Sequence, residues 1–74
     1  MNRQRRKRIE QAEKLLEQAQ EIIEEVQQEE QEALDNMPES FRDGFQGGVM
    51  ETNIDYMKEA YQQISDVLYG LNEI

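Results

Sequence analysis

The residues that break helices are confined to one short segment near the middle of the chain. Residues 36–48 hold the only proline, three of the four glycines and both phenylalanines of the 74 residues. The flanking stretches contain no other breaker except Gly70, which lies close to the C-terminus. Because proline and glycine are the residues least compatible with a helix interior, this distribution predicts two long helices joined by one turn.

The apolar residues of the first stretch recur at heptad spacing, which is the pattern of a helix that packs against other helices. A second row follows the first by three residues, and the two together predict a helix over residues 9–36. Glu30 occupies one slot of the first row, where we expect the bundle to be open to water. The rows are Ile9, Leu16, Ile23 and Met37, and Ala12, Ala19, Val26 and Ala33.

The segment 37–48 is predicted to be the turn. Pro38 disfavours a helical conformation at Met37, so the first helix ends there, and Pro38 to Phe41 have the composition of a single helical turn. Asp43 and Gln46 resemble a capping box, which would start the second helix near residue 44. The alternative starts that helix at Val49, so that it covers residues 49–73.

Two adjacent glycines, Gly47 and Gly48, need a physical reason if they lie inside a helix, because each costs about 1 kcal/mol relative to alanine. Close approach of another backbone is one reason, and room for a ligand is the other. We expect Phe41 and Phe45 to pack against the end of the hairpin, and the alternative is an exposed aromatic patch that docks a partner. The candidate ligand or partner residues are therefore Phe41, Arg42, Phe45, Gly47 and Gly48.

The apolar stripe of the second helix is wider than one partner helix can cover. This surplus predicts that an all-α antiparallel hairpin dimerises into a four-helix bundle or forms a higher oligomer. Tyr56 and Tyr69 lie at the margin of the stripe, where they would contact a neighbouring subunit. The predicted oligomer core comprises Leu16, Ile23, Val26, Met50, Ile54, Met57, Tyr61, Ile64, Leu68 and Leu71.

Charge is distributed unevenly along the chain. The net charge is −9, yet the first eight residues carry five basic side chains and no acidic one. Cations at a helix N-terminus oppose the helix dipole, so we expect residues 1–8 to be frayed. This basic N-terminal segment lacks interleaved aromatic residues, so we do not expect nucleic acid to be its partner. The rest of the chain is acidic and suits a basic protein surface. The basic tip consists of Arg3, Arg5, Arg6, Lys7 and Arg8.

Several kinds of chemistry lack the residues that they need. Cysteine and histidine are absent, which removes the usual ligands of zinc, haem and iron–sulfur clusters. No serine is accompanied by a histidine base, so we predict no enzyme and no cofactor. No apolar run approaches the ~20 residues that span a bilayer, and residues 1–30 contain no signal-peptide core. We therefore expect a cytoplasmic protein that makes no membrane contact, forming one domain over residues 1–74.

One segment carries a family resemblance. Residues 29–40 read EEQEALDNMPES, and Gly47, Met50, Ile54 and Ala60 continue the pattern. This resembles the EEQEAxDNxPES turn motif of small acidic helical-hairpin proteins encoded by bacteriophages and prophages. It covers most of the chain from Glu29 onward, with Met37 where leucine is more usual and the run 44–47 less charged. The resemblance implies a bacterial host and no particular activity.

These observations favour a non-catalytic helical protein that self-associates and binds a protein partner. For a phage-type protein, that partner would be a host defence or regulatory factor. Two alternatives remain open. One is an oligomeric sponge that sequesters a small nucleotide signal through the turn residues, and the other is nucleic-acid binding through the basic N-terminus.

Overall fold

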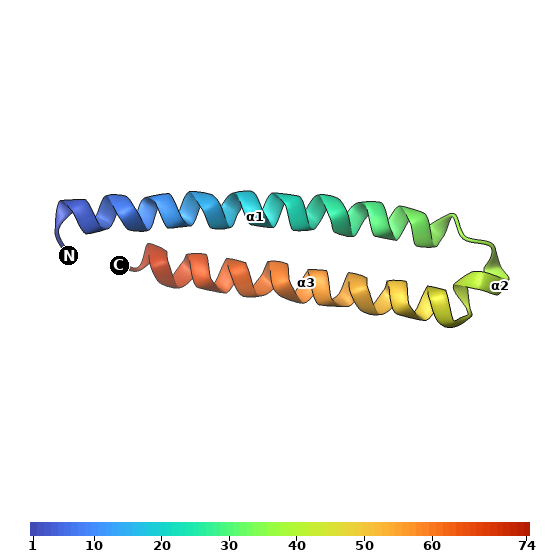
Figure 1. The fold of residues 1–74 in the computed structure, drawn as a ribbon. Helices are drawn as coiled ribbons and strands as arrows, with labels where there is room; N and C mark the ends of the chain where they lie inside the picture. The colour runs from blue at the N-terminus through green and yellow to red at the C-terminus, as the bar shows by residue number, and fades with distance from the viewer.

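The computed structural model describes all 74 residues and shows two long antiparallel helices joined by a short one (Figure 1). The helices are α1 (Arg3–Asp35), α2 (Glu39–Arg42) and α3 (Phe45–Asn72), and there is no strand. The molecule measures 58 × 15 × 12 Å, and its radius of gyration is 17.0 Å. A compact domain of this length would have a radius of about 11 Å. The all-α hairpin predicted from the heptads is confirmed, in an extended form.

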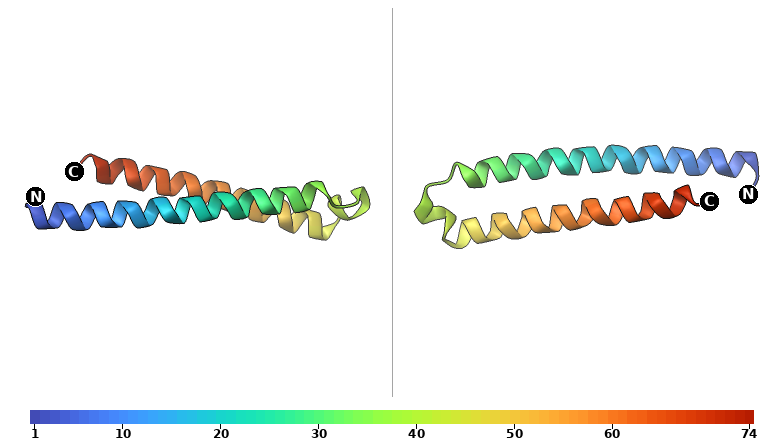
Figure 2. Two further views of the ribbon diagram at one scale, coloured as in Figure 1. Left: turned by 90° about the horizontal axis from the view of Figure 1, so that it is seen from above. Right: turned by 180° about the vertical axis from the view of Figure 1, so that it is seen from behind.

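Helices α1 and α3 lie side by side along most of their length, and α2 closes one end of the hairpin (Figure 1). Both termini lie at the opposite end, where the N-terminal turn of α1 projects past the end of α3 (Figure 1). Seen from above, the two helices cross at a shallow angle (Figure 2). The hairpin therefore has a closed end at the turn and an open end at the termini.

Helix α1 begins at Arg3, six residues before the predicted start at Ile9. The helix starts earlier because Asn2 caps its N-terminus. Asn2 has extended backbone angles, and its side-chain oxygen accepts a hydrogen bond of 2.9 Å from the Arg5 backbone N–H. An asparagine cap stabilises a helix end by about 1 kcal/mol, which offsets the unfavourable position of the basic side chains.

The turn begins where proline predicts it. Asn36 is the C-cap of α1, and Pro38 precedes the single helical turn Glu39–Arg42. The Arg42 guanidinium reaches back and donates to the carbonyl oxygens of Asp35 (3.2 Å) and Met37 (3.3 Å). A cation at this position satisfies carbonyl groups that a helix end leaves without partners, and it interacts favourably with the helix dipole.

Helix α3 has the earlier of its two predicted starts, but the proposed capping box is wrong. The capping residue is Gly44 rather than Asp43, and no side chain caps the helix. Asp43 has helical backbone angles because it closes α2, so its carboxylate is not placed over the first turn of α3. The first backbone bond of α3 runs from the Gly48 N–H to the Gly44 carbonyl at 3.1 Å.

The two helical glycines differ in their surroundings. A Cβ atom on Gly47 would collide with the carbonyl oxygen of Arg42, because α2 crosses directly against the first turn of α3. Gly47 is accordingly one of four buried residues. A Cβ on Gly48 would meet nothing within 4 Å. Close backbone approach therefore explains Gly47, and no contact in the hairpin explains Gly48.

Helices α1 and α3 contact each other through one apolar row on each helix. We call these two facing rows together the inner seam. Only two apolar side chains are buried there, Leu34 (5% exposed) and Ile54 (3% exposed). Val26 was predicted to share the apolar row of Ala12 and Ala19 and is exposed in the hairpin instead, because Gln27, one residue further on, turns toward α3; its place in an oligomer core stays a prediction. The other seam residues are half-buried: Ile9, Leu16, Ile23, Met37, Met50, Met57, Tyr61, Ile64, Leu68 and Leu71.

A polar residue occupies the middle of the inner seam. Gln20 is buried, and its side-chain amide donates to the Ser65 hydroxyl (2.7 Å) and to the Tyr61 carbonyl (3.0 Å). A buried amide without partners is costly, so these bonds favour the one alignment of α1 and α3 that provides them. Nothing in the heptad pattern marked Gln20 as different from the exposed glutamines.

Candidate interaction surface

A second apolar row on each long helix remains exposed to solvent. On α1, Leu15 and Ile22 have exposed fractions of 61% and 60%, although both are large aliphatic residues. Exposed side chains at similar spacing follow α3. We call the two rows together the outer face: Leu15, Ile22 and Val26 of α1, Val49, Tyr56 and Val67 of α3, and Ile74 just beyond the end of α3.

The two rows lie on the same side of the hairpin. On each helix, outer-face residues directly precede seam residues, as Leu15 precedes Leu16 on α1 and Val49 precedes Met50 on α3. One residue back along a helix is a rotation of about 100°, so both rows are turned from the seam in the same sense. Because α1 and α3 run antiparallel, the same rotation brings the rows together on one side (Figure 1). The outer face therefore lies on one side of the hairpin and includes residues of both helices, with Gln63 separating Tyr56 from Val67 in the α3 row.

The total surface is too large for a compact monomer. The hairpin exposes 5980 Å², whereas a compact monomer of its mass, 8.8 kDa, would expose about 4,800 Å². The excess is roughly 1,200 Å². A stable protein interface buries about 800 Å² on each partner, so the excess is sufficient for one such interface.

The turn residues proposed as ligand candidates are divided between different surroundings: Phe45 and Gly48 line a shallow hollow with Val49, Thr52 and Asn53, and the others lie elsewhere. The Arg42 guanidinium contacts main-chain carbonyls of the turn, and Gly47 lies buried against α2. The expected packing of the phenylalanines against the hairpin end is wrong: Phe41 is exposed and Phe45 has an exposed fraction of 86%. Each lies at the surface because Gly47 lets α2 itself pack against α3. Phe45 is one turn before Val49 and so extends the outer face to the closed end.

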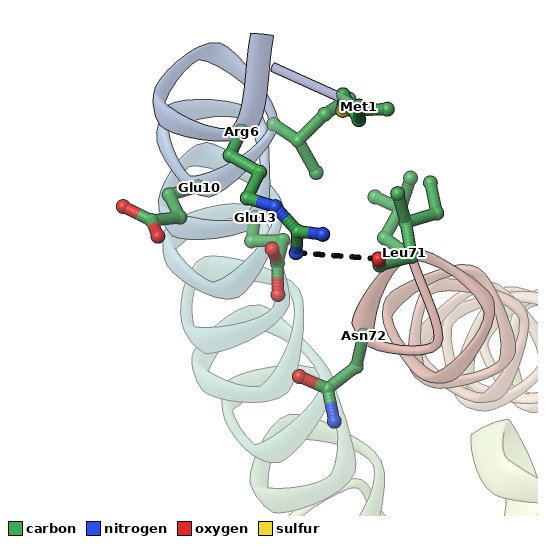
Figure 3. Close-up of a pocket in the computed structure, with 8 residues that line it drawn as sticks. Met1, Arg6, Glu10, Glu13, Leu71 and Asn72 are labelled. Carbon is green, nitrogen blue, oxygen red and sulfur yellow. Dashed lines mark hydrogen bonds between the residues drawn. The ribbon is translucent and has the colours of Figure 1, made fainter. Parts of the chain in front are cut away.

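The basic tip does not present a single basic face. Its five cations lie within six consecutive helical residues, and steps of about 100° distribute them around α1. One of them, Arg6, points across the open end of the hairpin toward the last turn of α3 (Figure 3). Its guanidinium donates to the Ile74 carbonyl at 3.3 Å, beside a hollow of about 240 Å³ that Glu10 and Glu13 also line.

The charges divide the hairpin into two electrostatically different halves. Residues 20–55, which form the closed half, contain eleven acidic side chains and one basic one. The open half, made of residues 1–19 and 56–74, contains six acidic and seven basic side chains. The molecule is therefore strongly negative at the turn and close to neutral at the termini, with the positive tip projecting beyond α3 (Figure 1).

The structure brings together no group of three or more acidic side chains that could hold a metal ion. None of its helices combines the length and the apolar character that crossing a membrane requires. Comparison of the chain with protein-family models, with curated proteins and with solved structures found no match. The outer face includes residues of both long helices, and of the predicted ligand candidates only Phe45 adjoins it.

Proposed function

We propose that the protein is a non-catalytic helical interaction protein that self-associates through the outer face and binds a protein partner. The observation that supports this is the set of exposed aliphatic and aromatic side chains that both long helices place on one side of the hairpin. Exposed apolar surface of this kind marks interaction sites in proteins that have to stay dissolved.

Self-association supplies stability that one hairpin lacks. Only Leu34 and Ile54 are buried apolar side chains, and the chain has no cysteine for a disulfide. A core of that size stabilises a chain of 74 residues only marginally. Covering the outer face would remove Leu15, Ile22 and Val26 from water together with the α3 row, and so add a second core beside the inner seam.

The same molecule is suited to a basic protein partner. The closed half carries eleven acidic side chains, and Phe41 and Phe45 stand exposed among them. Acidic surfaces attract basic surfaces, and exposed aromatic residues are frequent anchors in interfaces. The resemblance to phage-encoded hairpins supports a host defence or regulatory factor as that partner.

Sedimentation equilibrium over a wide range of protein concentrations tests self-association. We expect a mass above 8.8 kDa for the unmodified chain and a melting temperature that rises with concentration. The variant Ile22→Glu places a carboxylate in the middle of the outer face and should return the mass to that of a monomer. Gln28→Glu introduces the same charge at an exposed position on the opposite side of α1 and should leave the assembly unchanged.

A monomeric mass for the unmodified chain at every concentration would refute self-association. An assembly that Ile22→Glu does not disrupt would show that a different surface mediates it. Helix content measured by circular dichroism checks that each variant folds, since glutamate is well tolerated in helices.

A further inference from the structure

We infer that the occupant of the outer face is a second copy of the chain, oriented so that the two turns lie at opposite ends of the assembly. This inference rests on the proposed self-association and adds the orientation and the residues that determine it. Three observations support it: the residue order along one row, the charge of the two halves, and the position of the row within α1.

The outer-face row of α1 can pair with the same row of a second α1 that runs in the opposite direction. At heptad spacing it reads Arg8, Leu15, Ile22 and Glu29. If a second α1 runs antiparallel over this row, Arg8 lies opposite Glu29 of the second copy and Leu15 lies opposite its Ile22. A two-fold axis repeats each of these contacts, so the pairing provides two ion pairs flanking two aliphatic pairs.

The charge of the two halves favours the same orientation. With the turns at one end, two closed halves that each contain eleven acidic side chains and one basic one would face each other. With the turns at opposite ends, each acidic half faces the half that holds the five basic residues of the tip. Like charges across an interface are unfavourable and opposite charges select the orientation, most strongly at low ionic strength.

The row is also centred on its helix. Its midpoint lies between Leu15 and Ile22, and the midpoint of α1, Arg3–Asp35, is residue 19. Pairing about this point therefore overlaps the two copies of α1 along their full length. No overhang of α1 is needed to bring Arg8 to Glu29.

A charge swap tests the pairing. Arg8→Glu and Glu29→Arg should each raise the dissociation constant of the assembly roughly tenfold in dilute salt, because each creates two like-charged contacts. The double variant Arg8→Glu/Glu29→Arg restores two opposite pairs and should return the constant to within about twofold of the original. Raising the ionic strength to about 1 M should diminish the effects of the single variants.

Lys14→Glu and Glu17→Arg are the matched controls, because each makes the same change in net charge at an exposed position on α1 outside both the row and the basic tip. We expect them to change the dissociation constant less than twofold to threefold. If the controls weaken the assembly as much as the row variants do, or the double variant fails to recover, the assigned pairing is wrong.

The separation of the two turns provides an independent measurement. The chain has no cysteine, so Ser40→Cys allows one spin label at each turn. Opposite orientation should place the two labels roughly 60 Å apart, since the two ends of α1 would be about 50 Å apart at 1.5 Å per residue and Ser40 lies in α2 beyond that end. Turns at the same end would place them within about 20 Å, roughly two interhelical distances.

The possible results separate the two proposals. A short distance between labels, in an assembly that Ile22→Glu still disrupts, would overturn the orientation and leave self-association through the outer face intact. A chain that stays monomeric would remove both. A long distance together with recovery in the double variant would establish the antiparallel pair.

Discussion

The inner seam and the outer face are neighbouring stripes of the same two helices, and they have opposite environments. Leu16 of the seam packs against α3, while Leu15, the preceding residue, has an exposed fraction of 61%. Their chemistry does not explain this contrast, since both are leucines on one helix. The difference arises from the number of neighbouring helices. In a hairpin each long helix has one neighbour, and one neighbour covers one apolar stripe.

The contrast extends to polar residues. The seam buries an amide, Gln20, while the outer face exposes Ile22 only two residues away. A monomeric fold normally places such residues the other way round. The hairpin is therefore specified by a polar contact in the middle of a thin apolar seam, and much of its apolar surface faces away from that seam.

The difference between the inner seam and the outer face can be tested by truncating one leucine in each of them. Leu34→Ala removes a buried side chain and should lower the free energy of unfolding by about 2–5 kcal/mol. Leu15→Ala should cost less than about 1 kcal/mol in dilute solution, because its side chain is already in water. Urea denaturation measures both. A greater loss for Leu15→Ala at high protein concentration would show that the outer face becomes covered there.

The two glycines at the start of α3 make a second matched pair. Gly47→Ala should destabilise the hairpin by about 1–3 kcal/mol, because its Cβ would collide with the Arg42 carbonyl. Gly48→Ala should stabilise it by up to about 1 kcal/mol, since the new methyl group meets nothing and alanine favours the helix. Thermal unfolding of the two variants under identical conditions is the measurement. Equal effects of the same sign would contradict the close approach of α2 to α3.

The polar contact in the seam can be tested by removing one side or both. Gln20→Ala should cost about 1–3 kcal/mol, because it deletes bonds to Ser65 and Tyr61 and leaves a gap. Gln20→Leu combined with Ser65→Ala should recover much of that loss by replacing both polar partners with apolar groups. Gln28→Ala, at an exposed position of the same helix, should stay within about 0.5 kcal/mol of the original. If Gln20→Ala behaves like Gln28→Ala, the contact does not determine the register.

The smallest expected effect concerns the open end, beyond the last seam contact. Asn2→Ala removes the cap of α1 and should destabilise its first turn by about 1 kcal/mol. Amide hydrogen exchange at Arg5 should then accelerate roughly fivefold, with little change in global stability. Gln4→Ala is the control and should leave that exchange rate unchanged. Exchange at Arg5 that is already fast in the unmodified chain would indicate that the predicted fraying of residues 1–8 is correct.

Much of the architecture is local and could be derived from the sequence alone. The heptad rows determine two helices, and Pro38 determines where the first one ends, because its ring and its missing N–H exclude the interior of a helix. The absence of any other breaker leaves a hairpin as the only short connection. The surplus width of the α3 stripe likewise pointed to unpartnered apolar surface, which the structure shows as the outer face.

Which stripe of each long helix faces the other helix depends on the tertiary structure. The sequence favoured Val26 for the core, but packing turned Gln27 and Gln20 inward instead, since a rotation of one residue separates the alternatives. The reason for Gly47 depends on where α2 crosses α3, and the exposure of Phe45 follows from that crossing. Local propensities act within a few residues, whereas these outcomes depend on contacts between helices that are far apart in the chain, and spacing alone does not specify those contacts.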